Sequence, residues 1–372
     1  MPSKEQILDQ CERLHAYLVR RHYSEGLLHG PDPGVRFNWR LWRFAKSALE
    51  FLPWGDDYLF MQTQGNWVLA NWALYDATAN ARYRQIALEA TDATLALQKP
   101  EGYWVYPLPE RRHLIAALEG IWGAVPLLAT YARTSRAELL RAAQRAYEFL
   151  INRIGFQKHQ PGEAINYFDK PRGKIPNNSV IAVWSFLRLW QASGEARYLE
   201  HVAPLLEFIA AVQSPTGEIP YIVDSPLERG RDHYLCFQYN AHQFIHLCRS
   251  EMLRPGTGAK PIFTRLWKFL QRGVRPNGSC ANDCASLGGG PEVNYYTAAL
   301  GSASHYAFRM GVDPSDEIAQ RCFARVLARQ NADGRFGFST GNYGFLRDGR
   351  SYPRYQAMTL YHLLSVTGRE AF

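Results

Sequence analysis

The chain has 372 residues, of which 47% are hydrophobic and 20% charged, and its formal net charge at pH 7 is +8. This composition is typical of a soluble globular protein with a real core. No apolar run approaches the ~18 residues that a transmembrane helix needs, so a membrane span is excluded. The charged N-terminal segment lacks the apolar core of a signal peptide, and the six cysteines are scattered. We therefore expect reduced thiols and a cytoplasmic location.

Apolar residues recur at helical spacing along most of the chain, and strand-like alternation is nearly absent. Start and stop signals then predict helices in chain order. They cover 4–22, 38–52, 57–78, 81–98, 111–132, 136–153, 177–192, 195–213, 234–252, 260–273, 293–311, 315–330 and 353–367.

The connections between these helices alternate in length. The short ones are 78–80, 134–136, 193–195 and 311–314, and the long ones are 99–110, 154–176, 214–233, 274–292 and 331–352. Short and long loops therefore lie at opposite ends of the helices. Long loops without secondary structure are usually functional in a compact domain, so we expect the working face at the long-loop end.

One pattern recurs at intervals of ~55 to 60 residues, enough for two helices and a loop. A helix ends in Gln, and a Gly and aromatic residues follow. Clear copies begin at Gln98, Gln213 and Gln330, and looser copies at Gln157 and Gln271. The repeat predicts an all-α fold, a single (α/α)6 toroid of six hairpins with an extra N-terminal helix, and one domain over 1–372. The inner helices would start near Asp57, Arg111, Asn177, Tyr234, Val293 and Pro353.

The Gln-to-Gly-to-aromatic signature resembles the repeat of the terpenoid cyclase and protein prenyltransferase toroids. The turn at 193–198 (SGEARY) resembles turns of six-hairpin glycosidases and glucuronyl C5-epimerases. The resemblance covers most of the chain and implies an α/α toroid. It is a resemblance of architecture, which does not supply a function.

The acidic motifs of the cyclases are missing. No Asp-x-Asp-Asp acid is present, and the nearest pair, Asp56 and Asp57, is interpreted first as a helix cap and second as part of a site. Residues 282–292 carry Asn282, Asp283, Ser286 and Glu292 in partial likeness to a diphosphate-binding metal motif. The Gly-rich stretch before Glu292 would break the helix that such a motif needs.

Prenyltransferases bind zinc through Asp, Cys and His, and two local clusters invite comparison. One is Cys280 and Cys284 with Asp283, and the other is His242 and His246 flanked by Cys236 and Cys248. Histidines four residues apart and buried thiols are equally expected in a packed helix. We therefore expect no metal and no cofactor, and keep zinc as the alternative.

Polar and aromatic groups gather where the long loops enter the inner helices. Six helix N-termini would add their free N–H groups and positive dipole ends, so an anionic small molecule or glycan is the expected ligand. Amides and phenols facing the axis suit a sugar better than a hydrocarbon. No nucleic-acid module accompanies the charge, and we expect no nucleic-acid partner. The predicted substrate-binding residues are Arg111, Arg112, Trp104, Asn178, Lys174, Arg231, Asn240, Arg354 and Tyr355.

The leading hypothesis is a carbohydrate-active enzyme that acts on an acidic sugar or glycan by hydrolysis, β-elimination or C5-epimerisation. Glu292, His233 and Tyr295 are the candidate acid, base and assistant, with Asp57 and Asp232 in reserve. Two alternatives remain open. One is a terpenoid cyclase-like or prenyltransferase-like enzyme, which needs an apolar cavity or a metal. The other is a non-catalytic toroid that binds an acidic glycan or a protein.

Overall fold

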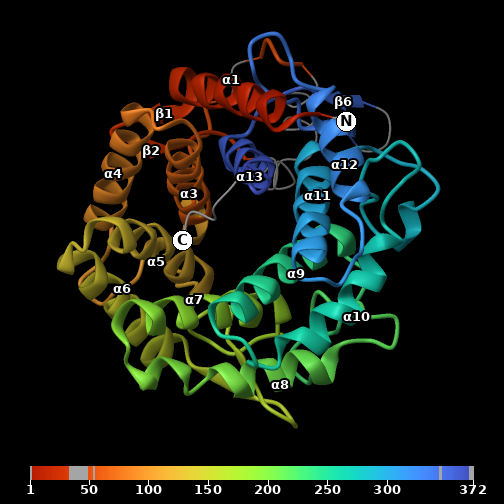
Figure 1. The fold of residues 1–372 in the computed structure, drawn as a ribbon. Helices are drawn as coiled ribbons and strands as arrows, with labels where there is room; N and C mark the ends of the chain where they lie inside the picture. Colours follow the sequence, from red (N-terminus) through yellow and green to blue (C-terminus); the bar gives the residue numbers. More distant parts are fainter. Residues whose placement is uncertain (1, 33–48, 53–54, 343–345, 368–372) are drawn as a thin grey trace.

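A computed structural model describes the chain except for residues 1, 33–48, 53–54, 343–345 and 368–372. Seen along its axis, the described part is a closed ring of paired helices (Figure 1). The inner helices are α3 (Met61–Thr78), α5 (Ala117–Thr134), α7 (Pro176–Ser193), α9 (Cys236–Leu253), α11 (Asn294–Arg309) and α13 (Pro353–Leu364). The outer helices are α4 (Ala81–Ala96), α6 (Ala137–Phe149), α8 (Val202–Val212), α10 (Ala259–Gln271), α12 (Glu317–Leu327) and α1 (Lys4–His22). The predicted α/α toroid is therefore confirmed.

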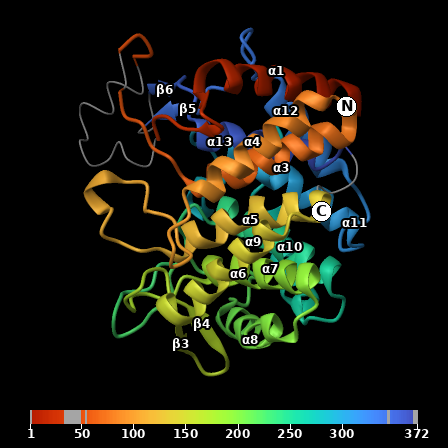
Figure 2. The same cartoon turned by 90° about the vertical axis from the view of Figure 1, so that its left-hand side faces the viewer.

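The remaining elements are short. Single-turn helices are η2 (Pro109–Arg111), η3 (Leu150–Ile154), η4 (Ala196–Leu199) and η5 (Cys284–Ser286). Antiparallel strand pairs are β1 (Tyr23–Ser24) with β2 (Leu27–Leu28), β3 (Phe156–Lys158) with β4 (Glu163–Ile165), and β5 (Ser339–Asn342) with β6 (Leu346–Asp348). Figure 2 shows that the long loops gather at one end of the helices, as the loop lengths predict.

In the three clear copies of the pattern, the Gln and the Gly hold a loop to the following outer helix. Gln98 Nε2 donates to the carbonyl of Gly102 at 3.1 Å and to that of Ala142 in α6 at 2.8 Å. Gly102 has a φ of +94° and packs so closely on the backbone of Arg145 that a Cβ would overlap it. The signature in the sequence is therefore a clamp between a loop and the following outer helix.

The same clamp gives the N-terminal helix its place. Gln330 Nε2 donates to the carbonyl of Gln10 in α1 at 2.8 Å, and Gly334 packs on the backbone of Arg13. Helix α1 also lies against α13, so it fills the outer position of the sixth hairpin and closes the ring. The N-terminal helix predicted as extra thus completes the toroid.

The core lies between the two rings, where Trp67, Trp72 and Trp267 are buried, and Trp184 is buried against Trp122 and His246 of neighbouring inner helices. The inner helices are buried nearly all round, so most polar groups on them need partners within the protein. None of the helices in the described part of the chain combines the length and hydropathy required to span a bilayer.

Helix α3 begins at Met61, four residues after the predicted start at Asp57. Asp57 therefore caps no helix. Its carboxylate lies 2.5 Å from His29 Nδ1 instead. The Met61 N–H donates to the carboxylate of Glu119 in α5 at 2.9 Å, so a neighbouring helix supplies the missing cap. Most of the helix predicted over 38–52 lies outside the described residues.

Candidate functional site

All six inner helices contribute to one cavity of about 130 Å³ at the loop end of the ring axis. One buried water needs ~10–15 Å³ by this measure, so the cavity has room for roughly ten non-hydrogen atoms, the size of a single sugar ring. The lining residues are Gln62, Leu118, Tyr167, Ile175, Asn177, Asn178, Tyr221, Gln238, Tyr239, Tyr295, Arg354, Tyr355 and Met358. Amides and phenols dominate this lining, and they match the hydroxyl groups of a sugar.

Two pairs of tyrosines form part of the wall. The ring centroids of Tyr221 and Tyr239 are 4.8 Å apart, and those of Tyr295 and Tyr355 are 4.5 Å apart. Burial raises the pKa of Tyr239 and of Tyr295 well above the ordinary tyrosine value, so both stay protonated and can donate. Their faces offer apolar surface for the C–H groups of a sugar.

Asn178 has an unusual position for a buried amide. The residue is 1% exposed, and neither its amide nitrogen nor its amide oxygen has a hydrogen-bond partner among the described residues. Asn178 lies in the first turn of α7, which begins at Pro176, and this turn lines the cavity. A buried polar group without a hydrogen bond lowers the free energy of unfolding, and hydrogen bonds to a ligand in the cavity would offset that loss.

Arg354 is the one cation among the described lining residues of the cavity. Its Nε lies 2.7 Å from Asp32 Oδ2, and its Nη2 donates to the Tyr355 hydroxyl at 2.6 Å. Burial alone would lower the pKa of the guanidinium, but the Asp32 carboxylate outweighs it and the net pKa is raised. The guanidinium centre also stacks 4.4 Å from the Phe60 ring. Arg354 is thus a fixed positive charge at the cavity wall.

Glu119 is not among the described lining residues of the cavity, but its carboxyl group is close enough to Arg354 for the charge of the guanidinium to act on its pKa. The residue is 3% exposed. Burial raises its pKa to about 7, although the hydrogen bond from Met61 N–H and the charge of Arg354 both act to lower it. A carboxyl group that titrates near neutral pH can both give and accept a proton there.

Two histidines lie one helical turn further along the axis. His242 follows Gln238 on α9, and His362 follows Met358 on α13; their ring centroids are 5.0 Å apart. The Nε2 atoms of both have no hydrogen-bond partner in the described structure. Burial lowers the pKa of His242 to about 4, so the imidazole is neutral at pH 7.

Four of the predicted site residues meet at the cavity, namely Asn178, Tyr295, Arg354 and Tyr355. Glu292 does not. Its carboxylate pairs with Arg325 at 2.8 Å and with Arg329 at 3.5 Å, and Asn277 donates to it at 2.8 Å. Burial of Glu292 acts to raise its pKa, but these donors outweigh that effect and the net pKa is lowered. Such an environment favours a permanent carboxylate over a proton donor.

The other predicted acid and base residues lie on the rim. His233 is exposed, and its Nδ1 is 2.9 Å from Glu218 Oε2. Asp232 is exposed, and Asp57 lines a shallower groove together with Trp104 and Arg112.

Most of the predicted binding residues have structural partners. Trp104 is 1% exposed and donates to the carbonyl of Thr94 at 2.8 Å. The Asn240 amide oxygen accepts from the N–H of Ile219, and its amide nitrogen donates to the carbonyl of Ile219. Lys174 donates to the carbonyl of Lys158 at 2.7 Å. Arg231 stacks 3.7 Å from the Tyr234 ring, and Arg111 and Arg112 are exposed. Among the predicted binding cations, Arg354 alone belongs to the described lining of the cavity.

The sequence pattern predicts no site role for Glu119, Gln62, Gln238 or Tyr239, although the structure places them at or near the cavity. A signal for Glu119 was present, because it is the only charged residue between His113 and Arg133. A lone acid in a buried helix needs a special partner or a function.

No family model and no curated protein matches the chain. Among solved structures, the chain is similar to a cellobiose 2-epimerase from Bacillus thermoamylovorans, with 11% identity, a TM-score of 0.75 and coverage of 97% of this chain and 99% of that chain. It is also similar to a D-mannose isomerase, with 12% identity, a TM-score of 0.72 and 98% coverage of both chains. A glycosyl hydrolase of family 88 from Bacteroides vulgatus has 11% identity and a TM-score of 0.68, with 98% of this chain and 99% of that chain covered. At these identities the likeness establishes the α/α toroid fold and nothing further.

Proposed function

We propose that this protein is a carbohydrate-active enzyme that binds one sugar unit in the central cavity and transfers protons within it. The observation that carries the proposal is Asn178, a buried amide at the cavity wall with neither atom hydrogen-bonded. Sugar hydroxyl groups both donate and accept, so they would satisfy both atoms. Solved structures of the same fold are described as epimerases, an isomerase and glycosyl hydrolases, which supports the same class of substrate.

The chemistry favoured here is elimination or epimerisation rather than hydrolysis. Hydrolysis with two carboxyl groups needs both to flank the reacting bond. Two carboxyl groups in the described part of the chain interact with Arg354. Asp32 is held in an ion pair with it, which leaves Glu119 to exchange a proton. The tyrosines beside Arg354 would assist, because a protonated phenol can donate to an oxygen that becomes negative.

An acidic sugar is the narrower form of the proposal. Its carboxylate would lie against Arg354, which already pairs with Asp32. A ligand carboxylate would therefore share the guanidinium and bind in competition with Asp32. A cytoplasmic location is part of the same proposal and is supported by six cysteines without a disulfide.

The test is a proton-exchange assay on a panel of neutral sugars and uronic acids. Each is incubated with the full chain in D₂O, and ¹H NMR follows loss of a ring C–H signal, appearance of an epimer or of an alkene product. We expect Glu119→Gln to slow the reaction by roughly 10²- to 10⁴-fold, the usual effect of losing a general acid or base. Asn178→Ala should weaken sugar binding, measured as loss of thermal stabilisation.

Glu292→Gln is the matched control, because it removes a carboxylate outside the cavity and should leave the rate unchanged. Stabilisation by prenyl diphosphates with no response to any sugar would reject the proposal in favour of a prenyl-group enzyme. Sugar binding without any exchange or turnover would leave a non-catalytic toroid.

A further inference from the structure

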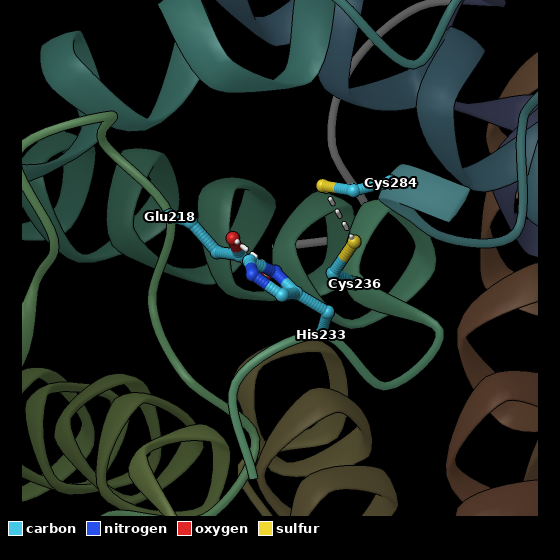
Figure 3. Close-up of side chains that lie close together, drawn as sticks. All are labelled: Glu218, His233, Cys236 and Cys284. Atoms are coloured by element: carbon cyan, nitrogen blue, oxygen red, sulfur yellow. Dashed lines mark hydrogen bonds and ion pairs between the residues drawn. The ribbon is translucent and has the colours of Figure 1, made fainter. Parts of the chain in front are cut away.

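Four side chains at the loop end of α9 converge on one point outside the central cavity (Figure 3). They are Glu218, His233, Cys236 and Cys284, and their ligand-type atoms all lie within 4.8 Å of one another. From this arrangement we infer that the protein holds a zinc ion between these four side chains. The inference is independent of the proposed function, because no sugar contact is part of it.

The fold brings the four together from three separate segments. Glu218 follows the Gln213–Gly217 clamp, His233 ends the same loop, and Cys236 is the first residue of α9. Cys284 belongs to η5, in the loop after α10. Between His233 and Cys236, Leu235 has a φ of +45°, which a leucine rarely adopts. Figure 3 shows the His233 ring against the Glu218 carboxylate and the Cys236 thiol directed at the thiol of Cys284.

The distances match a tetrahedral zinc site. Two sulfurs bound at ~2.3 Å in tetrahedral geometry lie about 3.8 Å apart. The Sγ atoms of Cys236 and Cys284 are 3.7 Å apart. The Nδ1 of His233 lies 2.9 Å from Glu218 Oε2 and would move a few tenths of an ångström outward as both turn to the metal. All ligand atoms lie within 4.8 Å of one another, so the most widely separated pair would close by about 1 Å at most when zinc binds.

The donor set selects the metal. Two thiolates, an imidazole and a carboxylate suit zinc, whereas magnesium and calcium prefer oxygen ligands alone. Glu218 and Cys236 are buried, Cys284 is half-buried and His233 is exposed, so a metal ion can enter from the His233 side. Four protein ligands fill a tetrahedral site, which indicates a structural role rather than a catalytic one.

The role of the metal is to fix the cavity wall. The ligands tie the loop over 213–235 and the loop over 272–293 to the start of α9. Gln238 and Tyr239, which line the cavity, lie in the next few residues of this helix. Tyr234, next to His233, has its ring centroid 4.8 Å from that of Tyr221. Zinc would therefore hold these tyrosines in position.

The chain offers a matched control at a second acid–histidine pair. Glu163 follows Gly162 as Glu218 follows Gly217, and its Oε1 lies 2.6 Å from His201 Nδ1. Neither Glu163 nor His201 belongs to the cluster of Glu218, His233, Cys236 and Cys284. His201→Ala and His233→Ala therefore remove the same type of side chain from similar pairs, only one of which belongs to the inferred site.

The experiment measures metal content in the full chain, without an affinity tag, after equilibration with zinc and removal of the excess. We expect about one zinc per chain by mass spectrometry of the metal, and a thiolate-to-cobalt absorption band after cobalt substitution. His233→Ala should weaken zinc binding at least ~10-fold, since even partners behind a ligand are worth 10- to 100-fold. Cys236→Ser and Cys284→Ser should each weaken the cobalt band, and His201→Ala should match the wild type.

Hydrogen–deuterium exchange tests the structural role. Chelation should increase exchange in 213–235 and 280–292 and leave 99–116 unchanged. Circular dichroism confirms that each variant is folded. Because His233 is exposed, His233→Ala is not expected to unfold the protein. Three results would each overturn the inference. The wild type could hold less than a tenth of an equivalent of zinc, or His233→Ala and His201→Ala could bind zinc equally well. Protein isolated without oxygen could also contain a Cys236–Cys284 disulfide.

Discussion

The cavity wall and the rim of the toroid use the same residue types in opposite ways. Near the wall, Glu119 is buried with a pKa raised to about 7, whereas at the rim Glu292 lies between Arg325 and Arg329 and its pKa is lowered. The amides differ in the same manner. Asn178 has no partner for either side-chain atom, and Asn240 bonds to the backbone on both.

The difference shows where the protein tolerates the free-energy cost of burying a polar or ionisable group. The partners of Glu292 and Asn240 hold loops in place, whereas Asn178 carries the cost of a buried amide without a hydrogen bond in the described structure. Position along the helices does not separate the two kinds, because each Glu and each Asn lies near the start of an inner helix. The comparison can be tested one pair at a time.

The largest expected effect is the pH dependence that Glu119 gives to folding. Its folded-state pKa of about 7 lies above the ordinary value of 4.5, so the folded chain keeps the proton longer than the unfolded chain. The associated stability is complete below pH 4.5 and is lost as the pH rises through 7, a loss of about 3 kcal/mol. Urea unfolding of the wild type and of Glu119→Gln between pH 4.5 and 8 measures it. Parallel curves for the two proteins would contradict the raised pKa.

The second effect separates the two amides. Asn240→Ala leaves the buried N–H and carbonyl of Ile219 without partners and should cost about 2 kcal/mol of unfolding free energy. Asn178→Ala removes an amide that bonds to nothing described, so its cost should stay within about 0.5 kcal/mol. Chemical denaturation without sugar measures both. An equal cost for both would mean that Asn178 has a structural role.

The smallest effect is expected at Glu292. Glu292→Gln breaks ion pairs that are partly open to solvent, and we expect a loss of about 1 kcal/mol at pH 7. Because the folded-state pKa is lowered, this stability is present above the ordinary pKa and disappears as the pH falls through the folded-state value. The sign is opposite to that of Glu119. Melting temperatures at pH 7 and at pH 3 test it, and an undiminished difference at pH 3 would exclude the ion pair as its source.

The site could be predicted only in part. Asn178, Tyr295, Arg354 and Tyr355 were predictable because they start inner helices next to long loops. Glu292 satisfied the same criterion, but arginines one turn apart on α12 and just beyond its end face it across the α11–α12 hairpin. The predicted binding residues Lys174 and Arg231 also belong to long loops, but Lys174 donates to a backbone carbonyl and Arg231 stacks on a tyrosine ring.

By itself, the sequence determined the architecture. Helical periodicity, the Gln and Gly of each clamp, and the alternation of loop lengths are local features that directly indicate paired helices with one functional end. Only the tertiary structure decided which polar groups lack partners and which distant groups meet. Gln330 reaches α1 across 320 residues, and Cys236 meets Cys284 across 48. Such pairings depend on how the ring closes, and burial, partner choice and pKa follow from that closure rather than from any segment alone.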